Sequence, residues 1–217
     1  MKKLSTYLLC ICLLASLSVV HLESTVTATL QSCVSICDET GDSCGAGFIV
    51  AKGYVVTARH VTKAFEISGM ILCVRLPDGE LVQVTKVIPL AVAKGKPIDA
   101  SLLKVDTKSN PPAKLGDPAT LKPAQTVFAV GAPYGLEQSV TVGVISALHR
   151  NFTFGGLRFT DAIQTSGLLH PGNSGGPLLT QNGLIIGINV IGVGDHGGIG
   201  MAVPITQIKT ALQRNGL

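Results

Sequence analysis

From Gly45 onward the chain is a succession of short apolar runs separated by turn residues. The runs include YVVTA, ASLLKV, TVFAV and LIIGINV, and the dipeptides Asp78-Gly79 and Asn182-Gly183 lie between such runs. Short apolar runs bounded by turn residues are typical of β-strands, and Asp-Gly and Asn-Gly favour hairpin turns. Helical spacing of apolar residues occurs only near the end, at Ile208, Ala211 and Leu212. We therefore predict an all-β domain with a short terminal helix over residues 205–215.

A proline-rich stretch interrupts the strands in the middle of the chain. Residues 108–123 contain four prolines and few β-branched residues, which predicts a linker. The linker separates two strand-rich halves, residues 45–107 and 124–204. Each half is long enough to form a small closed barrel.

The N-terminus has the pattern of a secretory signal peptide. Lys2 and Lys3 precede an apolar run from Tyr7 to Val20, which at 14 residues is shorter than the roughly 20 needed to span a bilayer. We predict a signal peptide over residues 1–24, cut between residues 24 and 28, and hence an exported protein, periplasmic or extracellular. An uncleaved signal anchor is the alternative, and only in that case do we expect a membrane association.

The cysteines are interpreted in the light of export. Four cysteines follow the signal peptide, an even number in a compartment that permits disulfides, and the N-terminal segment of residues 25–44 carries three of them. A zinc site is the competing interpretation, but no Cys-x-x-Cys pair with a second ligand pair is present. We predict disulfides and no metal site, and the pairing stays open among three arrangements. The candidate cysteines are Cys33, Cys37, Cys44 and Cys73.

The charge pattern argues against a nucleic-acid partner. The formal net charge is +4, two of the cationic residues are Lys2 and Lys3, and the rest form no basic stripe. Binding to nucleic acid needs a cluster of Lys and Arg that neutralises phosphates. We expect none here.

The most informative segment is HPGNSGGPLL, which places Ser174 among Gly172, Gly175 and Gly176. Glycines let backbone N–H groups point toward a reacting carbonyl and let a substrate approach closely. A serine in this setting indicates nucleophilic acyl transfer, which also requires a general base and a carboxylate that orients the base.

His60 and Asp99 are the candidates for base and carboxylate. His60 ends the buried run GYVVTARH, which holds a side chain at the rim of a core, whereas His170 is only four residues from the serine. Asp99 enters the apolar run IDASLLKV, where a charge is costly unless it is hydrogen-bonded. Structural roles remain open for both residues: a core histidine and a cap at the start of a strand.

Three motifs in this order, TARHV, IDASLLKVD and GNSGGPLL, resemble the His, Asp and Ser motifs of trypsin-like serine proteases, most closely the HtrA (DegP-like) branch. The segments LGDPATLKPAQTVFAVGAPYGL and TVGVISALHR extend the resemblance to roughly Gly45 to Leu212. It implies a chymotrypsin/trypsin-like double β-barrel over residues 45–217, with His60 and Asp99 from the first barrel and Ser174 from the second.

The resemblance also implies a role for each residue. Ser174 corresponds to the nucleophile, His60 to the general base and then acid, and Asp99 to its orienting carboxylate. The N–H groups of Gly172 and Ser174 correspond to the oxyanion hole. The implied activity is an endopeptidase that acts on unfolded or extended polypeptides through an acyl-enzyme and needs no cofactor.

Some features depart from the family pattern. Asn173 stands where digestive enzymes have an aspartate that receives a new N-terminus, so we expect no activation by that ion pair; HtrA-like enzymes share the asparagine. Arg59 is larger than the residue expected before His60. HtrA proteins usually continue into PDZ domains, whereas this chain ends after its terminal helix, so we expect no docking by PDZ and leave the oligomeric state open.

By the same resemblance, aliphatic residues wall the pocket for the side chain before the cut bond. We expect a preference for Val, Ala, Ile or Leu, because a pocket for Lys or Arg needs a carboxylate, and Asp195 is the one residue that could supply it. The expected pocket residues are Leu168, Leu169, Ile188, Asn189, Val190 and Ile191.

Two rival interpretations were weighed. The segment GNSGG also fits the G-x-S-x-G elbow of α/β-hydrolases, but that fold places its acid and histidine after the serine. The other rival is a catalytically silent or regulated protein of the protease fold that binds peptides by adding a strand to a sheet edge. Labelling of Ser174 by a fluorophosphonate separates this binder from a protease.

Overall fold

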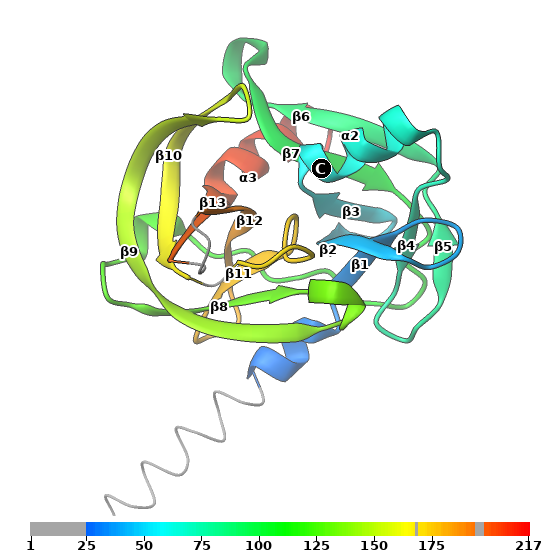
Figure 1. The fold of residues 1–217 in the computed structure, drawn as a ribbon, viewed down its shortest axis with the longest axis horizontal. Helices are drawn as coiled ribbons and strands as arrows, with labels where there is room; N and C mark the ends of the chain where they lie inside the picture. Colours follow the sequence, from blue (N-terminus) through cyan, green and yellow to red (C-terminus); the bar gives the residue numbers. More distant parts are fainter. Residues whose placement is uncertain (1–24, 168, 194–197) are drawn as a thin grey trace, which may run out of the picture.

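Two β-sheets make up the molecule, which is described here by a computed structural model for residues 25–167, 169–193 and 198–217 (Figure 1). The first sheet has the strand order β5-β4-β1-β2-β3-β7-β6, and the second is a closed barrel with the order β10-β13-β12-β11-β8-β9. The first sheet contains β1 (Cys33–Cys37), β2 (Ser43–Ala51), β3 (Tyr54–Thr57), β4 (Cys73–Arg75), β5 (Leu81–Gln83), β6 (Lys86–Ala91) and β7 (Pro97–Lys104). The barrel contains β8 (Thr126–Gly131), β9 (Ser139–Phe154), β10 (Leu157–Ser166), β11 (Pro177–Thr180), β12 (Ile185–Val193) and β13 (Ile199–Pro204).

The all-β prediction and the terminal helix are confirmed. The apolar runs of β3 and β7 pair in antiparallel register, with Val55 opposite Leu103 and Val56 opposite Leu102, and all four side chains are buried. Helix α3 (Ile205–Arg214) buries one apolar face against the barrel strands β12 and β13. The buried apolar side chains form two clusters, one that includes residues of both sheets and one within the barrel. Strands too short to be stable alone are stabilised by this pairing and packing.

A second helix, α2 (Arg59–Ser68), was not predicted. The sequence indicated a strand leading into a turn at His60, but β3 ends at Thr57 and α2 begins two residues later. Its buried residues are Val61, Thr62 and Phe65, and it ends at Gly69, whose φ is +74°. Val61 and Phe65 do recur at helical spacing, but they directly follow the apolar run of β3, and the segment was therefore assigned to the end of a strand.

The segment 25–44 does not stand apart from the first sheet. Residues 25–30 are helical, β1 pairs with both β2 and β4, and the domain boundary expected at Gly45 falls inside β2. The predicted signal peptide lies outside the described residues. No helix within the described ranges is long and apolar enough to cross a membrane.

The connection between the sheets packs on both of them. It includes the short helix η2 (Pro118–Thr120), while two further single turns, η1 (Ala93–Gly95) and η3 (Pro133–Gly135), follow β6 and β8. The Ala113 N–H donates to Ile49 O in the first sheet, and the Gly116 N–H donates to Ile185 O in the barrel, each at 2.8 Å.

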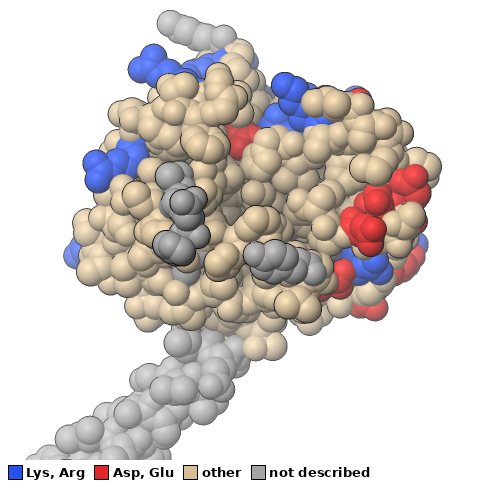
Figure 2. Space-filling view, viewed as in Figure 1, with Lys and Arg blue, Asp and Glu red and all other residues tan. Residues whose placement is uncertain are grey.

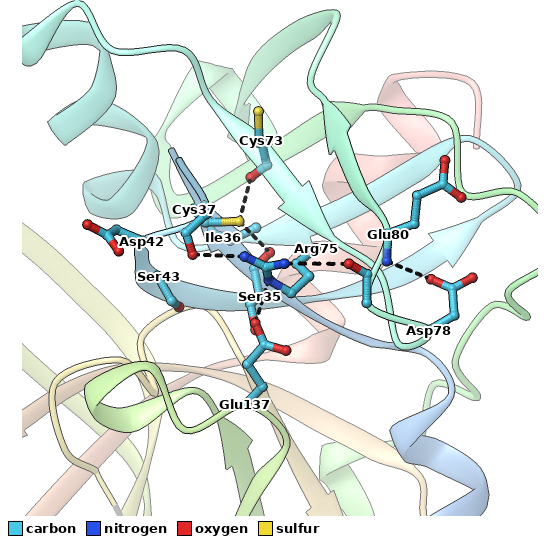
Figure 3. A network of polar contacts seen from close by, with 12 residues as sticks. Ser35, Ile36, Cys37, Asp42, Ser43, Cys73, Arg75, Asp78, Glu80 and Glu137 are labelled. Carbon is cyan, nitrogen blue, oxygen red and sulfur yellow. Dashed lines mark hydrogen bonds and ion pairs between the residues drawn. The ribbon is translucent and has the colours of Figure 1, made fainter. Parts of the chain in front are cut away.

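The four cysteines of the described chain are free thiols, which differs from the disulfides expected. Figure 3 shows two of them, Cys37 and Cys73, on neighbouring strands. Cys33 is opposite Phe48 in the core and four residues along β1 from Cys37, about 13 Å away at the rise of a strand. Cys44 and Cys73 lie beside the Cys37 end of β1, so Cys33 is too far from all three other thiols and two bridges cannot form at once. Burial raises the pKa of the Cys33 and Cys37 thiols to about 12 and that of Cys44 to about 11.

Candidate active site

His60 and Asp99 meet between the first turn of α2 and the start of β7. The Asp99 side chain is 2% exposed and accepts two hydrogen bonds from His60, one from imidazole Nδ1 at 2.7 Å and one from the backbone N–H at 2.9 Å. The imidazole is 41% exposed. Because an ionised carboxylate only accepts, Nδ1 carries the proton and Nε2 keeps its lone pair.

Both sheets hold the main chain around Ser174. The Ala46 N–H of β2 donates to Ser174 O at 2.9 Å, and the Gly175 N–H donates to Asn189 O of β12 at 2.7 Å. A Cβ atom at Gly175 would overlap Thr57 Oγ1, and one at Gly176 would overlap Val130 O. Close packing at the junction of the sheets therefore requires the glycines that follow the serine.

Residues 170–173 form a tight turn immediately before Ser174. The Asn173 N–H donates to His170 O at 3.0 Å, and Gly172 has a φ of +98°. Proline fixes the φ of Pro171 at about −65°, and a positive φ at the next residue makes this a type II turn. In a type II turn the peptide between the two central residues, here Pro171 and Gly172, is flipped relative to a type I turn. Within the described ranges, neither the Gly172 N–H nor the Ser174 N–H donates to a protein acceptor.

The Ser174 hydroxyl points to the barrel. Its Oγ donates to Val190 O at 3.5 Å, and no hydrogen bond joins it to His60 Nε2 in the described part of the chain. Both side chains line the same cavity. A rotation about the serine Cα–Cβ bond therefore moves Oγ within a space that His60 already borders.

That cavity has a volume of about 470 Å³. Figure 2 shows the molecule hollowed near the middle of this face, with most of the visible charged side chains toward its margins. Apolar side chains dominate the walls. The lining residues are His60, Asp99, Phe154, Gly155, Leu157, Phe159, Leu169, His170, Pro171, Ser174, Val190, Ile191 and Gly192.

Three of the expected pocket residues, Leu169, Val190 and Ile191, line the cavity. Ile188 and Asn189 are buried and do not line it. The Asn189 amide instead donates to Pro177 O at 3.0 Å, and its backbone N–H donates to Gly176 O at 2.9 Å. Leu168 and Asp195 lie outside the described residues.

Leu169 occupies the inner end of the pocket. Gly192 and Gly200 are opposite each other on the paired strands β12 and β13, and neither has a side chain to fill the space beside Leu169. A Cβ at Gly192 would lie 3.4 Å from Leu169 Cβ, and one at Gly200 would lie 3.2 Å from Leu169 Cγ. The leucine therefore fills space that two glycines would otherwise leave open.

The β9-β10 hairpin contributes walls that sequence reasoning missed. Phe154 and Leu157 flank the turn at Gly155-Gly156, and both are exposed, Phe154 by 51%. Phe159 stacks on Phe152 with ring centroids 4.7 Å apart. Two large apolar residues beside a Gly-Gly turn were the available signal, since a hairpin tip is normally polar.

The described part of the chain holds no cluster of metal-ligating side chains. Within residues 25–167, 169–193 and 198–217, no three His, Cys, Asp or Glu side chains form a group that could hold a metal ion.

Comparisons with known proteins agree with this geometry. The model of the trypsin-like peptidase domain matches residues 45–188. A Pseudomonas putida protein named probable periplasmic serine endoprotease DegP-like is 38% identical over 181 residues, covering 80% of this chain and 36% of that protein. The putative serine protease HhoA of Synechocystis is 38% identical over 169 residues, covering 76% and 41%. The chain thus spans about a third to two fifths of the length of these curated relatives.

Solved structures show the same fold. The HtrA-type protease AlgW with a tripeptide superposes with a TM-score of 0.71 at 32% identity, covering 88% of this chain and 61% of AlgW. Deg5 superposes with a TM-score of 0.69 at 30% identity, covering 90% of this chain and 92% of Deg5. The predicted double β-barrel is therefore confirmed. The chain belongs to the trypsin-like peptidase family, and proteases of the HtrA type are among its close relatives.

Proposed function

We propose that the protein is a serine endopeptidase in which Ser174 is the nucleophile, His60 the general base and then acid, and Asp99 the group that orients His60. The observation that carries the proposal is the hydrogen bond from His60 Nδ1 to the buried Asp99 carboxylate, at the mouth of the cavity that Ser174 lines. This bond fixes the tautomer that leaves Nε2 able to accept a proton.

The proposed reaction begins when Ser174 Oγ turns from Val190 O toward His60 Nε2. Oγ attacks the peptide carbonyl as Nε2 takes its proton, and the Asp99 carboxylate stabilises the resulting imidazolium. The tetrahedral intermediate collapses when His60 returns the proton to the leaving amine. Water then attacks the acyl-enzyme as His60 Nε2 takes its proton, and His60 returns a proton to Ser174 Oγ as the carboxylic acid product leaves. The enzyme is thereby regenerated.

The N–H groups of Gly172 and Ser174 are the proposed oxyanion donors. The type II turn at residues 170–173 supports this assignment, because among the described residues the Gly172 N–H beside the serine has no protein acceptor. One such donor typically contributes about 3 to 4 kcal/mol to transition-state stabilisation. The turn therefore prepares the site before substrate arrives.

The proposed preference before the cut bond is a small or medium aliphatic residue. Leu169 shortens the pocket, Val190 and Ile191 give it apolar walls, and the described lining holds no carboxylate other than Asp99, which His60 already engages. Phe154 and Leu157 extend the apolar surface along the cleft. A hydrophobic segment of an unfolded polypeptide is the substrate that fits these walls.

The decisive experiment compares the wild type with Ser174→Ala and His60→Ala in casein cleavage and in labelling by a fluorophosphonate. We expect the wild type to cut and to label at Ser174, both variants to be folded and inactive, and EDTA to have no effect. Full activity of either variant would overturn the assignment. Loss of wild-type activity in EDTA would instead support metal-dependent chemistry.

A catalytically silent peptide-binding protein is the second candidate. The hydrogen bond of Ser174 Oγ to Val190 O favours it, because in that orientation the nucleophile is not in contact with its base. A binder of this kind would bind an extended peptide without cutting it and would not label with a fluorophosphonate.

Export and a single disulfide complete the proposal. The signal-peptide pattern and relatives named periplasmic support export to the periplasm. Cys37 and Cys73 are directly opposite each other on β1 and β4, at a Cα spacing that a disulfide accommodates. We propose this pair as a single bridge that forms in an oxidising compartment.

A further inference from the structure

A buried pair of hydroxyl groups lies beside the His60 and Asp99 contact. Thr62 follows His60 by two residues in α2, and Ser101 follows Asp99 by two residues in β7. Thr62 Oγ1 and Ser101 Oγ are 2.9 Å apart, and both residues are fully buried. Helix α2 is therefore joined to β7 at two neighbouring levels, first by His60 with Asp99 and then by Thr62 with Ser101.

The protons of this pair can be assigned. Thr62 Oγ1 lies 3.0 Å from Arg59 O and accepts from Arg59 Nη1 at 3.0 Å. When the Thr62 hydroxyl donates to Arg59 O, the Ser101 hydroxyl donates to Thr62 Oγ1, and every group is satisfied. Among the described residues, Ser101 has no other side-chain partner. A hydroxyl inside an apolar strand is costly without such a bond, so the two residues depend on each other.

Arg59 holds the Thr62 hydroxyl from the solvent-facing side of α2. Its guanidinium donates to both carboxylate oxygens of Glu66, each at 2.8 Å, and also to Thr62. This explains the large residue before His60, which the family resemblance did not lead us to expect. The network runs from a surface ion pair, across the helix turn that contains His60, to a hydroxyl in the strand that contains Asp99.

The first turn of α2 has few other anchors. Its N-cap residue is Ala58, which provides no side-chain cap, and the turn contains no acidic residue. Helix N-termini normally need such caps for their unpaired N–H groups. Here Asp99 accepts the His60 N–H, and the Thr62 and Ser101 pair attaches the next residues of the turn to β7.

We propose that Thr62 and Ser101 are positioning residues that hold His60 against Asp99, a role that rests on the serine protease function proposed above. They touch neither substrate nor Ser174. Their effect passes through the first turn of α2, whose displacement would move Nε2 away from the nucleophile. Misplacement of a catalytic group by a fraction of an ångström lowers the rate without weakening substrate binding.

The test uses Thr62→Val, which keeps the shape and removes the hydroxyl, with Thr62→Ser as the matched control that keeps the hydroxyl. We expect Thr62→Val to lower kcat by about tenfold with KM within about twofold of the wild type. Thr62→Ser should stay within about threefold of the wild-type kcat. The proton resonance of His60 Nδ1–H, observed by NMR, should shift or broaden in Thr62→Val and not in Thr62→Ser.

Ser101→Ala provides an independent variant from the strand side. It should lower kcat as Thr62→Val does, and the double variant should be no worse than either single variant, because each single change already breaks the shared contact. A purely structural role predicts lower thermal stability with unchanged kcat and an unchanged His60 resonance in the folded variants. That result in Ser101→Ala or Thr62→Val would overturn the positioning role.

The outcome is separable from failure of the proposed function. If wild-type Ser174 does not label with a fluorophosphonate, the protease assignment fails, and the positioning role built on it fails as well. If the wild type labels and the variants keep its kcat and its His60 resonance, the positioning role alone fails.

Discussion

Replacing Gly172 by alanine tests whether the turn before Ser174 is an oxyanion donor. The residue has a φ of +98°, which costs a residue with a side chain about 1 to 2 kcal/mol. The new Cβ would also overlap Ala132 O and lie 2.7 Å from Pro133 Cα. The available relief is a flip of the peptide between Pro171 and Gly172, which turns the type II turn into type I and reverses the N–H.

The expected loss follows from the donor that the flip removes. Withdrawal of one oxyanion donor costs about 3 to 4 kcal/mol, so kcat should fall by about a hundredfold to a thousandfold. KM should change little, because the donor acts mainly on the transition state. The assay is steady-state cleavage of a fluorogenic peptide with an aliphatic residue before the cut, together with the rate of fluorophosphonate labelling.

Gly79→Ala is the matched control. Gly79 has a φ of +89°, and no atom lies within 4 Å of its ideal Cβ, so the change introduces backbone strain without a clash and far from the serine. It should lower stability by about 1 kcal/mol and leave kcat unchanged. If Gly172→Ala keeps kcat near that of Gly79→Ala, with both proteins folded, the Gly172 N–H is not an oxyanion donor.

Three further predictions concern the pocket, the thiols and a surface ion pair. Leu169→Ala enlarges the pocket beside Gly192 and Gly200, so cleavage after Phe relative to Val should rise by about tenfold in a peptide library profiled by mass spectrometry; an unchanged profile contradicts the proposed pocket. Oxidised glutathione should remove two hydrogens from the protein through the Cys37 and Cys73 pair, and a loss of four would contradict the single bridge. Hydrogen bonds from Arg59 hold the pKa of Glu66 below its usual value. The ion pair therefore stabilises the folded protein at pH values above the usual pKa of a glutamate, and this contribution is lost as the pH falls through the lowered pKa. Glu66→Gln should therefore destabilise by less than about 1 kcal/mol in urea unfolding at neutral pH and by nothing in acid, and an equal loss in acid would contradict this linkage.

The strands were predictable because their apolar runs are short and bounded by turn residues. The Asn182-Gly183 hairpin is confirmed, with Gly183 at a φ of +68° between β11 and β12. Helix α2 escaped prediction because it begins two residues after β3, and its apolar residues Val61 and Phe65 were assigned to the end of that strand's apolar run. Strand β1 escaped because its cysteines pointed to crosslinks, whereas they serve as buried apolar residues between β2 and β4.

The candidate site was predictable where a residue type has few uses. A serine between glycines and an aspartate entering an apolar strand are chemically unusual, and the structure brings Asp99 to His60 and places both on the cavity that Ser174 lines. Asn189 was assigned to the pocket by the family resemblance. Alternation along β12 instead turns it inward, and the bulge between Asn189 and Ile191 allows the next two residues to face the cavity.

The distance between base and nucleophile depends on how the two sheets pack. Strand β3 leads directly into the helix turn of His60, and its Thr57 Oγ1 donates to Ala46 O at 2.7 Å. The same Ala46 donates its N–H to Ser174 O, and Gly175 packs against Thr57. Thr57 and Ala46 of the first sheet therefore connect the strand that precedes His60 to the backbone at Ser174 and Gly175. Because glycine is the only residue that permits this approach, the spacing of the site is determined by backbone contact between the sheets and not by the loops around the cleft.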